Sequence, residues 1–166
     1  QGDPYLWLVI GGLLSIFISG RWMIAVAGWL APLFLLHYAH AVPFWPALLG
    51  LWLAAALAFG IANWRVVPVP VFIFPLVVLF LSSPPVLPYL ADRLLAPALP
   101  GFLSTLVFPL AWTAMEYLGA RLSPFGTWGS LAYSQAGNRP LLQLAAHTGL
   151  WGIVFMLTWF ASAANR

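Results

Sequence analysis

The near absence of charge is the feature of this sequence that most limits what it can fold into. The 166 residues carry six basic and three acidic side chains, whereas 63% of positions are apolar and the mean hydropathy is +0.98. A soluble domain needs about a quarter of its residues charged to cover its surface. Most of the surface must therefore face lipid. The expected fold class is an all-α, polytopic transmembrane helical bundle, because helices satisfy their own backbone hydrogen bonds in hydrocarbon.

The positions of the charges divide the chain into membrane-length segments. A helix needs about 20 residues to cross about 30 Å of hydrocarbon, and the uncharged stretches predict about six spans. These spans are expected near residues 5–20, 22–40, 44–63, 68–91, 97–120 and 140–163. The first segment lacks the basic start and the cleavage site of a secretory signal, so we expect a retained helix. Residues 1–166 are interpreted as one transmembrane domain.

Two sequence features predict details of the helices. Small residues recur at four-residue spacing, which favours close packing of helices within one bundle. They are Gly11, Ser15 and Ser19 in the first segment, and Ala54, Ala58 and Ala62 in the third. The Pro84-Pro85 pair is expected to end or kink the fourth segment near Ser83, because proline cannot continue the helical hydrogen bonds.

Composition also argues against several functions. The lack of cysteine excludes disulfides, thiolate metal sites and a cysteine nucleophile within these residues. The arginines are spread singly, so no basic run points to nucleic acid. His37 and His40 could face one metal ion, but no third ligand is in view, and we interpret them as interfacial histidines. His147 falls within the last expected span and is interpreted as a neutral, hydrogen-bonded residue of the bundle. Neither a metal nor another cofactor is expected.

Residues 116–139 form the one polar and irregular region. Glu116 is the single acidic residue inside an expected span, and a charge at mid-bilayer costs about 2.5–3.5 kcal/mol. Two interpretations stay open: an interfacial carboxylate paired with Arg121, or a carboxylate that orients a loop or a substrate head group. The loop that follows contains glycine and proline, which break regular structure. Its interface-seeking aromatics are Phe125, Trp128 and Tyr133.

This loop has a plain and a functional interpretation. It could be a simple interfacial connector between two helices. A plain connector has little need of so many aromatic residues, whereas a loop folded back over the bundle would use them. We therefore expect Trp128 to pack against the bundle at the membrane interface, near Glu116, and to border a lipid-accessible groove.

The run from Trp112 to Asn165 resembles the membrane domain of the apolipoprotein N-acyltransferase family. The resemblance rests on four short motifs and, more loosely, on two earlier ones. The four are Glu116-Tyr117-Leu118, Tyr133-Ser134-Gln135, Pro140-Leu141-Leu142-Gln143-Leu144-Ala145 and Thr148-Gly149-Leu150-Trp151-Gly152. The looser ones are Trp29-Leu30-Ala31-Pro32 and Asn63-Trp64.

The resemblance implies a function that these residues alone do not supply. Members of the family join a membrane bundle to a nitrilase-like domain that carries a Glu-Lys-Cys catalytic set. Its cysteine takes an acyl group from a phospholipid and passes it to the amino terminus of a lipoprotein. Because this chain has neither cysteine nor lysine, we expect the catalytic domain beyond residue 166 and no acyl transfer by residues 1–166 alone.

The resemblance further implies candidate site residues, partners and a location. Its motif residues and loop give the candidates for binding lipid or positioning the loop: Glu116, Arg121, Phe125, Trp128, Tyr133, Ser134 and Gln135. The implied partners are membrane lipids, a phospholipid acyl donor and a lipoprotein acceptor. The implied location is the bacterial inner membrane, with the 121–139 loop periplasmic.

The arginines conflict with that orientation. It places four arginines outside and two inside, whereas the positive-inside rule favours the opposite arrangement. The alternative to an acyltransferase is a non-enzymatic membrane scaffold or a small transporter module. A catalytic segment containing Glu, Lys and Cys in the parent reading frame would distinguish the two hypotheses.

Overall fold

The structure, a computed structural model, describes residues 3–166, and these residues form helices and connecting loops without any strand. The expected all-α fold is confirmed. The α-helices are α1 (Pro4–Ser15), α2 (Ala25–Ala41), α3 (Phe44–Asn63), α4 (Phe74–Leu81), α5 (Leu87–Leu95), α6 (Phe102–Leu122), α7 (Arg139–Thr148) and α8 (Leu150–Ala164). Short 3₁₀ helices are η1 (Pro84–Val86), η2 (Ala96–Ala98) and η3 (Leu131–Gln135).

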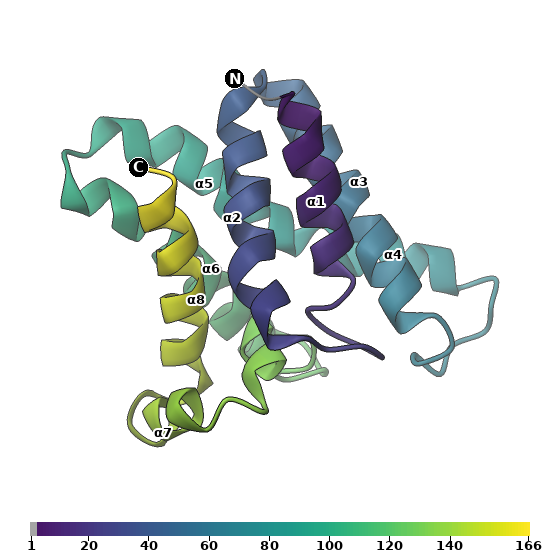
Figure 1. The fold of residues 1–166 in the computed structure, drawn as a ribbon. Helices are drawn as coiled ribbons and strands as arrows, with labels where there is room; N and C mark the ends of the chain where they lie inside the picture. The colour runs from purple at the N-terminus through teal and green to yellow at the C-terminus, as the bar shows by residue number, and fades with distance from the viewer. Residues whose placement is uncertain (1–2) are drawn as a thin grey trace.

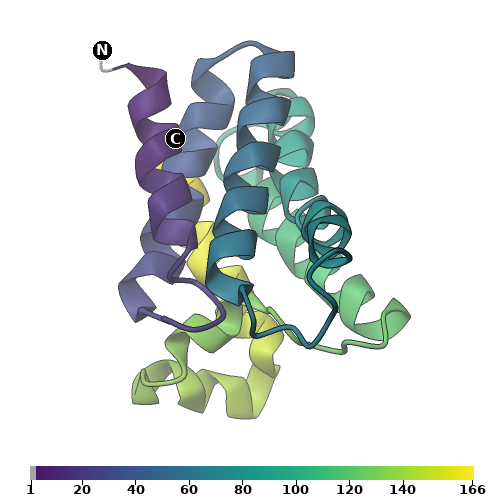
Figure 2. The same ribbon diagram turned by 90° about the vertical axis from the view of Figure 1, so that its right-hand side faces the viewer.

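The bundle has two distinct ends (Figures 1 and 2). The terminal end holds the start of α1, the end of α8 and the α2–α3 turn. The loop end holds the connections 16–24, 64–73 and 123–138 together with α7. Helix α1 packs on α2 and α3, and α8 packs on α2 and α6. Arginines 21, 65, 121 and 139 therefore belong to the loop end, and arginines 93 and 166 to the terminal end.

Small residues let the first helices approach closely. A Cβ atom at Gly11 of α1 would lie 2.7 Å from Cγ of Leu35 on α2. Ala58 and Ala62 of α3 are 4% and 1% exposed. Bulkier side chains at such positions would push the helices apart, so the packing interpretation of these residues is confirmed at the α1–α2 contact.

The core lies where α2, α3, α6 and α8 meet. Tyr38, Leu51, Phe108 and Leu157, one from each helix, are almost completely buried. The Tyr38 hydroxyl donates to the Pro46 carbonyl oxygen at 2.8 Å, which satisfies its one donor inside the core.

The proline pair changes the helix type as expected. Helix α4 ends at Leu81, η1 contains Pro84 and Pro85, and α5 begins at Leu87. The sequence from Phe74 to Ala98 still forms one apolar rod of 25 residues. In Figure 1 this rod crosses behind α1 and α2 from the α4 label to the α5 label.

Six full-length spans are not confirmed. Among the described residues, two helices are long and apolar enough to cross a membrane, Phe44–Asn63 and Phe74–Ala98, and the α7–α8 pair would make a third. Helices α1 and α2 are apolar but contain only 12 and 17 residues. Helix α6 has 21 residues, and polar side chains such as Glu116 lower its hydropathy.

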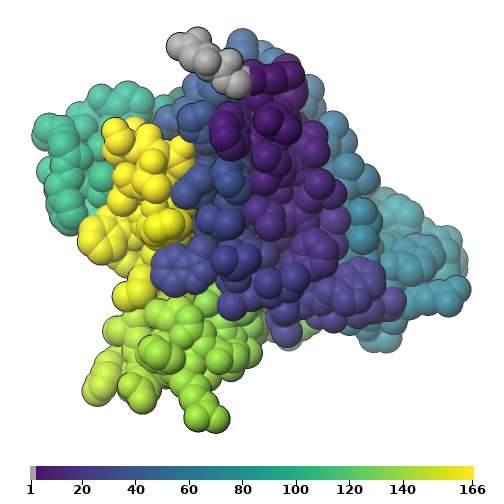
Figure 3. Space-filling model, in the orientation of Figure 1, coloured from purple at the N-terminus to yellow at the C-terminus, as the bar shows by residue number. Residues whose placement is uncertain are grey.

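The last expected span, 140–163, is broken rather than straight. Gly149, with φ 65°, separates α7 from α8, and the two helices meet at 119°. Figure 3 shows α7 and the loop before it as a lobe below α8 and α2. His147 lies on α7 with an exposed side chain. Our interpretation of His147 as a residue inside the bundle is therefore wrong, because the break diverts α7 away from the core.

Candidate functional site at the loop end

Glu116 joins the end of α6 to the following loop. Its Oε1 accepts hydrogen bonds from Trp112 Nε1 at 2.8 Å and from the Leu131 backbone N–H at 3.0 Å. Its Oε2 accepts a hydrogen bond from Ser130 Oγ at 2.6 Å. Charge-assisted hydrogen bonds of this kind are short and strong. The carboxylate thus fixes the point at which the loop turns into η3.

Of the two interpretations of Glu116, the ion pair with Arg121 does not form, and the carboxylate instead binds the loop. Arg121 instead lies over the ring of Tyr117, with 5.7 Å from Cζ to the ring centroid. Both ion pairs of the described residues involve Asp92 at the opposite end. Residues 116 and 121 point to different sides of α6, because five residues are not a whole number of helical turns.

Gln135 holds the other end of η3 against α2. Its side chain is completely buried, and its Nε2 donates to the Ala25 carbonyl oxygen at 2.7 Å and to Ser134 Oγ at 2.9 Å. Its Oε1 accepts from Trp29 Nε1 at 3.2 Å. Ser134 Oγ in turn donates to the Leu131 carbonyl oxygen at 2.7 Å. Ser134 and Gln135 are therefore interior residues of the bundle.

Gly28 of α2 allows η3 to lie this close to α2, and sequence reasoning did not single out Gly28. A Cβ atom there would lie 2.2 Å from Ser134 Oγ and 3.0 Å from Gln135 Nε2. The only signal in the sequence is a glycine inside an apolar helix, which often marks a close approach of another segment.

The aromatic residues of the loop form its outer edge. Phe125, Trp128 and Tyr133 are 53%, 45% and 44% exposed. Trp128 packs edge-on against Phe59 of α3 with 5.9 Å between ring centroids. The Tyr133 hydroxyl lies 2.7 Å from Thr127 Oγ1. Trp128 thus packs against the bundle as expected, and its place at a membrane interface stays a prediction.

An apolar groove of ≈ 480 Å³ lies between α3 and α4. Its wall consists of Ala56, Leu57, Gly60, Ile61, Trp64, Phe74, Pro75, Val78 and Leu79. Trp128 is not part of this wall, so it does not border the groove as we expected. It contacts Phe59, the neighbour of Gly60 on the helix that forms one side of the groove.

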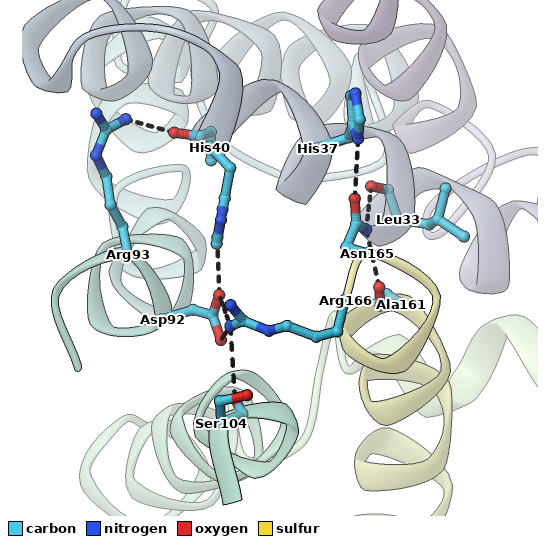
Figure 4. Close-up of polar contacts among 10 residues, drawn as sticks. Leu33, His37, His40, Asp92, Arg93, Ser104, Ala161, Asn165 and Arg166 are labelled. Atoms are coloured by element: carbon cyan, nitrogen blue, oxygen red, sulfur yellow. Dashed lines mark hydrogen bonds and ion pairs between the residues drawn. The ribbon is translucent and has the colours of Figure 1, made fainter. Parts of the chain in front are cut away.

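A second polar cluster occupies the terminal end (Figure 4). The fully buried Asp92 accepts from His40 Nε2 at 2.8 Å and from Arg166 Nη2 at 2.9 and 3.1 Å. His37 Nδ1 lies 3.1 Å from Asn165 Oδ1. The two histidines thus have separate partners. No group of three or more metal-ligating side chains occurs in residues 3–166. Sequence reasoning did not single out Asp92, although it is one of only three acidic residues.

Comparison with known proteins agrees with the motifs at the loop end. The chain matches the family described as apolipoprotein N-acyltransferase N-terminal domain over residues 7–163. An apolipoprotein N-acyltransferase from Geobacter metallireducens is 42% identical over 50 residues, which are 30% of this chain and 10% of that protein. No solved structure matches the chain. Because the family match covers nearly all described residues, the chain belongs to the apolipoprotein N-acyltransferase N-terminal domain family.

Proposed function

We propose that this chain is the membrane platform and lipid entry of an enzyme that transfers a phospholipid acyl chain to the amino terminus of a lipoprotein. The chemistry belongs to a nitrilase-like domain outside residues 1–166. There a cysteine thiolate displaces the lipid alcohol from the acyl ester and forms a thioester. The lipoprotein amine then attacks the thioester, which gives an amide and releases the thiol. The membrane domain presents the lipid to that site.

The observation that carries this proposal is the attachment of the loop by Glu116. Two donors of the loop, Ser130 Oγ and the Leu131 N–H, bind this carboxylate and anchor the C-terminal end of the loop. The third donor, Trp112 Nε1 on the same helix, holds the carboxylate in place. Because this end of the loop is anchored, the loop can hold large exposed aromatic side chains at a defined place. Aromatic side chains with a polar edge favour the membrane–water interface, where lipid head groups lie.

The groove between α3 and α4 supplies a place for an acyl chain. Its lining side chains are apolar throughout, and it opens on the outer surface of the bundle near the loop end. An acyl chain gains about 0.8 kcal/mol for each CH₂ group transferred from water, but little when it moves from other lipid tails. The groove therefore serves to orient the chain rather than to extract it from the membrane.

We further propose that the α-helical passes of the bundle all cross the inner membrane, with the loop end periplasmic. Helices α1 and α2 are short, so the bilayer around them must thin or their flanking residues must reach the interface. The cysteine-free sequence permits a direct test with single cysteines. An impermeant maleimide should label Gly137→Cys in intact spheroplasts, and Ala41→Cys only after permeabilisation. The reverse result would refute the orientation, and labelling of both in intact spheroplasts would refute the crossing.

The role of the exposed aromatic side chains of the loop is tested by Trp128→Ala in the full-length enzyme. Acylation of a lipoprotein substrate should fall more than the amount of folded protein in the membrane. Trp45→Ala is the matched control, because Trp45 is 69% exposed and lies at the start of α3, at the terminal end. Equal acylation per folded protein in wild type and Trp128→Ala would favour the plain connector.

A further inference from the structure

Arg21 is held at the loop end of α3 by its own backbone and side chain. The Arg21 N–H donates to the Ala62 carbonyl oxygen at 3.3 Å, and its Nη2 donates to the Trp64 carbonyl oxygen at 2.9 Å. Gly20, with φ 83°, allows this contact, because a Cβ atom there would lie 2.7 Å from the Ala62 oxygen. The guanidinium group is therefore placed beside Trp64, a wall residue of the groove.

Arg65 lies next to the same residue in an unusual backbone conformation. Its φ is 61°, and among the described residues it is the one non-glycine with positive φ. Such a conformation costs free energy for an L-residue and is found mainly where the surrounding structure or a function requires it. Arg65 lines a small cavity of ≈ 30 Å³ whose wall includes Trp64 and Phe74. Both also line the groove, so the small cavity and the groove share these two wall residues.

Neither arginine has a carboxylate partner within residues 3–166. The ion pairs of that part of the chain both belong to Asp92, at the terminal end. At the loop end, the Glu116 carboxylate is occupied by Trp112, Ser130 and Leu131. Arg21 and Arg65 are exposed. Two unneutralised positive charges therefore flank Trp64, at one end of an apolar groove.

We propose that Arg21 and Arg65 bind the phosphate group of a phospholipid whose acyl chain lies in the α3–α4 groove. The inference rests on the proposed role of the groove and adds the residues that recognise the head group. The guanidinium fork matches phosphate oxygens geometrically, and its charge complements theirs. The groove accepts the chain, and the arginines hold the head group outside it. Both are positioning residues, because they fix the lipid without contacting the reacting cysteine.

The test measures lipid retained by the purified chain in native mass spectrometry. The probes are phosphatidylglycerol and a diacylglycerol with the same acyl chains, which lacks the phosphate. The variants are Arg21→Gln, Arg65→Gln and the two combined, and the control is Arg139→Gln, which removes one positive charge at the same end. The combined variant should lower phosphatidylglycerol retention about tenfold or more and leave diacylglycerol unchanged. A loss in Arg139→Gln equal to that in each single variant, or an equal loss of both lipids, would overturn the proposal.

Gly60→Leu separates this inference from the proposed role of the groove. A Cβ atom at Gly60 meets Val78 methyl groups at an ordinary 3.8 Å, so leucine would fill the groove without disturbing the backbone. We expect it to lower retention of both lipids. If it changes neither, both proposals fail. If it lowers both while the arginine pair has no effect, only the arginine inference fails.

Arg65→Gly tests whether a loss of lipid retention reflects the missing guanidinium group rather than a loss of stability. Glycine accepts a positive φ without strain, so this variant should keep or raise the melting temperature. It should still lower phosphatidylglycerol retention, since the guanidinium group is lost. Unchanged retention in Arg65→Gly would remove Arg65 from the proposed site.

Discussion

Ser130 donates a hydrogen bond of 2.6 Å to Glu116 across 14 residues of sequence. This contact closes the loop that follows α6 onto the helix from which the loop departs. The loop is therefore anchored at Ser130, although it contains two glycines with positive φ, Gly126 and Gly129.

Glu116→Ala should destabilise the chain by about 1–3 kcal/mol, because it leaves the donors of Trp112, Ser130 and Leu131 without their acceptor. The melting temperature in detergent and the rate of proteolysis within 123–130 measure the effect. Asp3→Asn is the control, because Asp3 caps α1 by accepting a hydrogen bond from the Tyr5 N–H at 3.0 Å, and Asn caps a helix about as well as Asp. If Glu116→Ala is cleaved within 123–130 at the same rate as the wild type, the carboxylate does not hold the loop.

Gly28→Ala should cost about 1–3 kcal/mol, because the added methyl group overlaps Ser134 Oγ. Gly137→Ala is the matched control, because a Cβ atom at Gly137 has no neighbour within 4 Å. Adding Ser134→Ala to Gly28→Ala should restore part of the loss by removing the overlapping oxygen. Thermal unfolding measures all three, and a neutral Gly28→Ala would contradict the close approach of η3 to α2.

Arg65→Gly should raise the free energy of unfolding by up to about 1 kcal/mol, since it relieves the left-handed conformation of Arg65. Arg65→Ala should give no such gain, because alanine has the same Cβ penalty. The two variants therefore distinguish backbone strain from loss of charge. A stabilised Arg65→Ala would attribute the effect to charge repulsion among the loop-end arginines instead.

Asp92→Ala should be the most destabilising single change at the terminal end, by about 3–5 kcal/mol, because it leaves Arg166 and His40 without their buried partner. His40→Gln should cost less, since Arg166 still pairs with the carboxylate. Chemical denaturation in mixed micelles compares the free energies of unfolding of the two variants. A smaller loss of unfolding free energy for Asp92→Ala than for His40→Gln would contradict the central position of Asp92.

The sequence was sufficient for the all-helical fold and for the family because both depend on local patterns, whereas the six full-length spans are not confirmed. The uncharged stretches predicted helices, and the Pro84-Pro85 pair predicted the change at η1. The break at Gly149 was missed because residues 140–163 contain no charge that would exclude a straight span. A glycine between two apolar runs is compatible with either arrangement until the neighbouring segments are known.

The polar contacts were harder to predict because they join distant residues. Glu116 was singled out, but its partners at 130 and 131 follow a loop whose path the sequence does not fix. Arg121 is only five residues away, and proximity in sequence favoured the wrong partner. Asp92 and Arg166 are separated by 74 residues, and only the folded bundle brings them together.

In the proposed membrane arrangement, the bend of 119° at Gly149 would determine how the domain responds to bilayers of different thickness. Because α7 turns away from the direction of α8, α7 would limit how deeply α8 is immersed. A thinner bilayer would then be accommodated by tilting α8 around Gly149 rather than by sliding the bundle along the membrane normal. The immersion depth of the aromatic loop would stay constant while the opposite end of α8 moves.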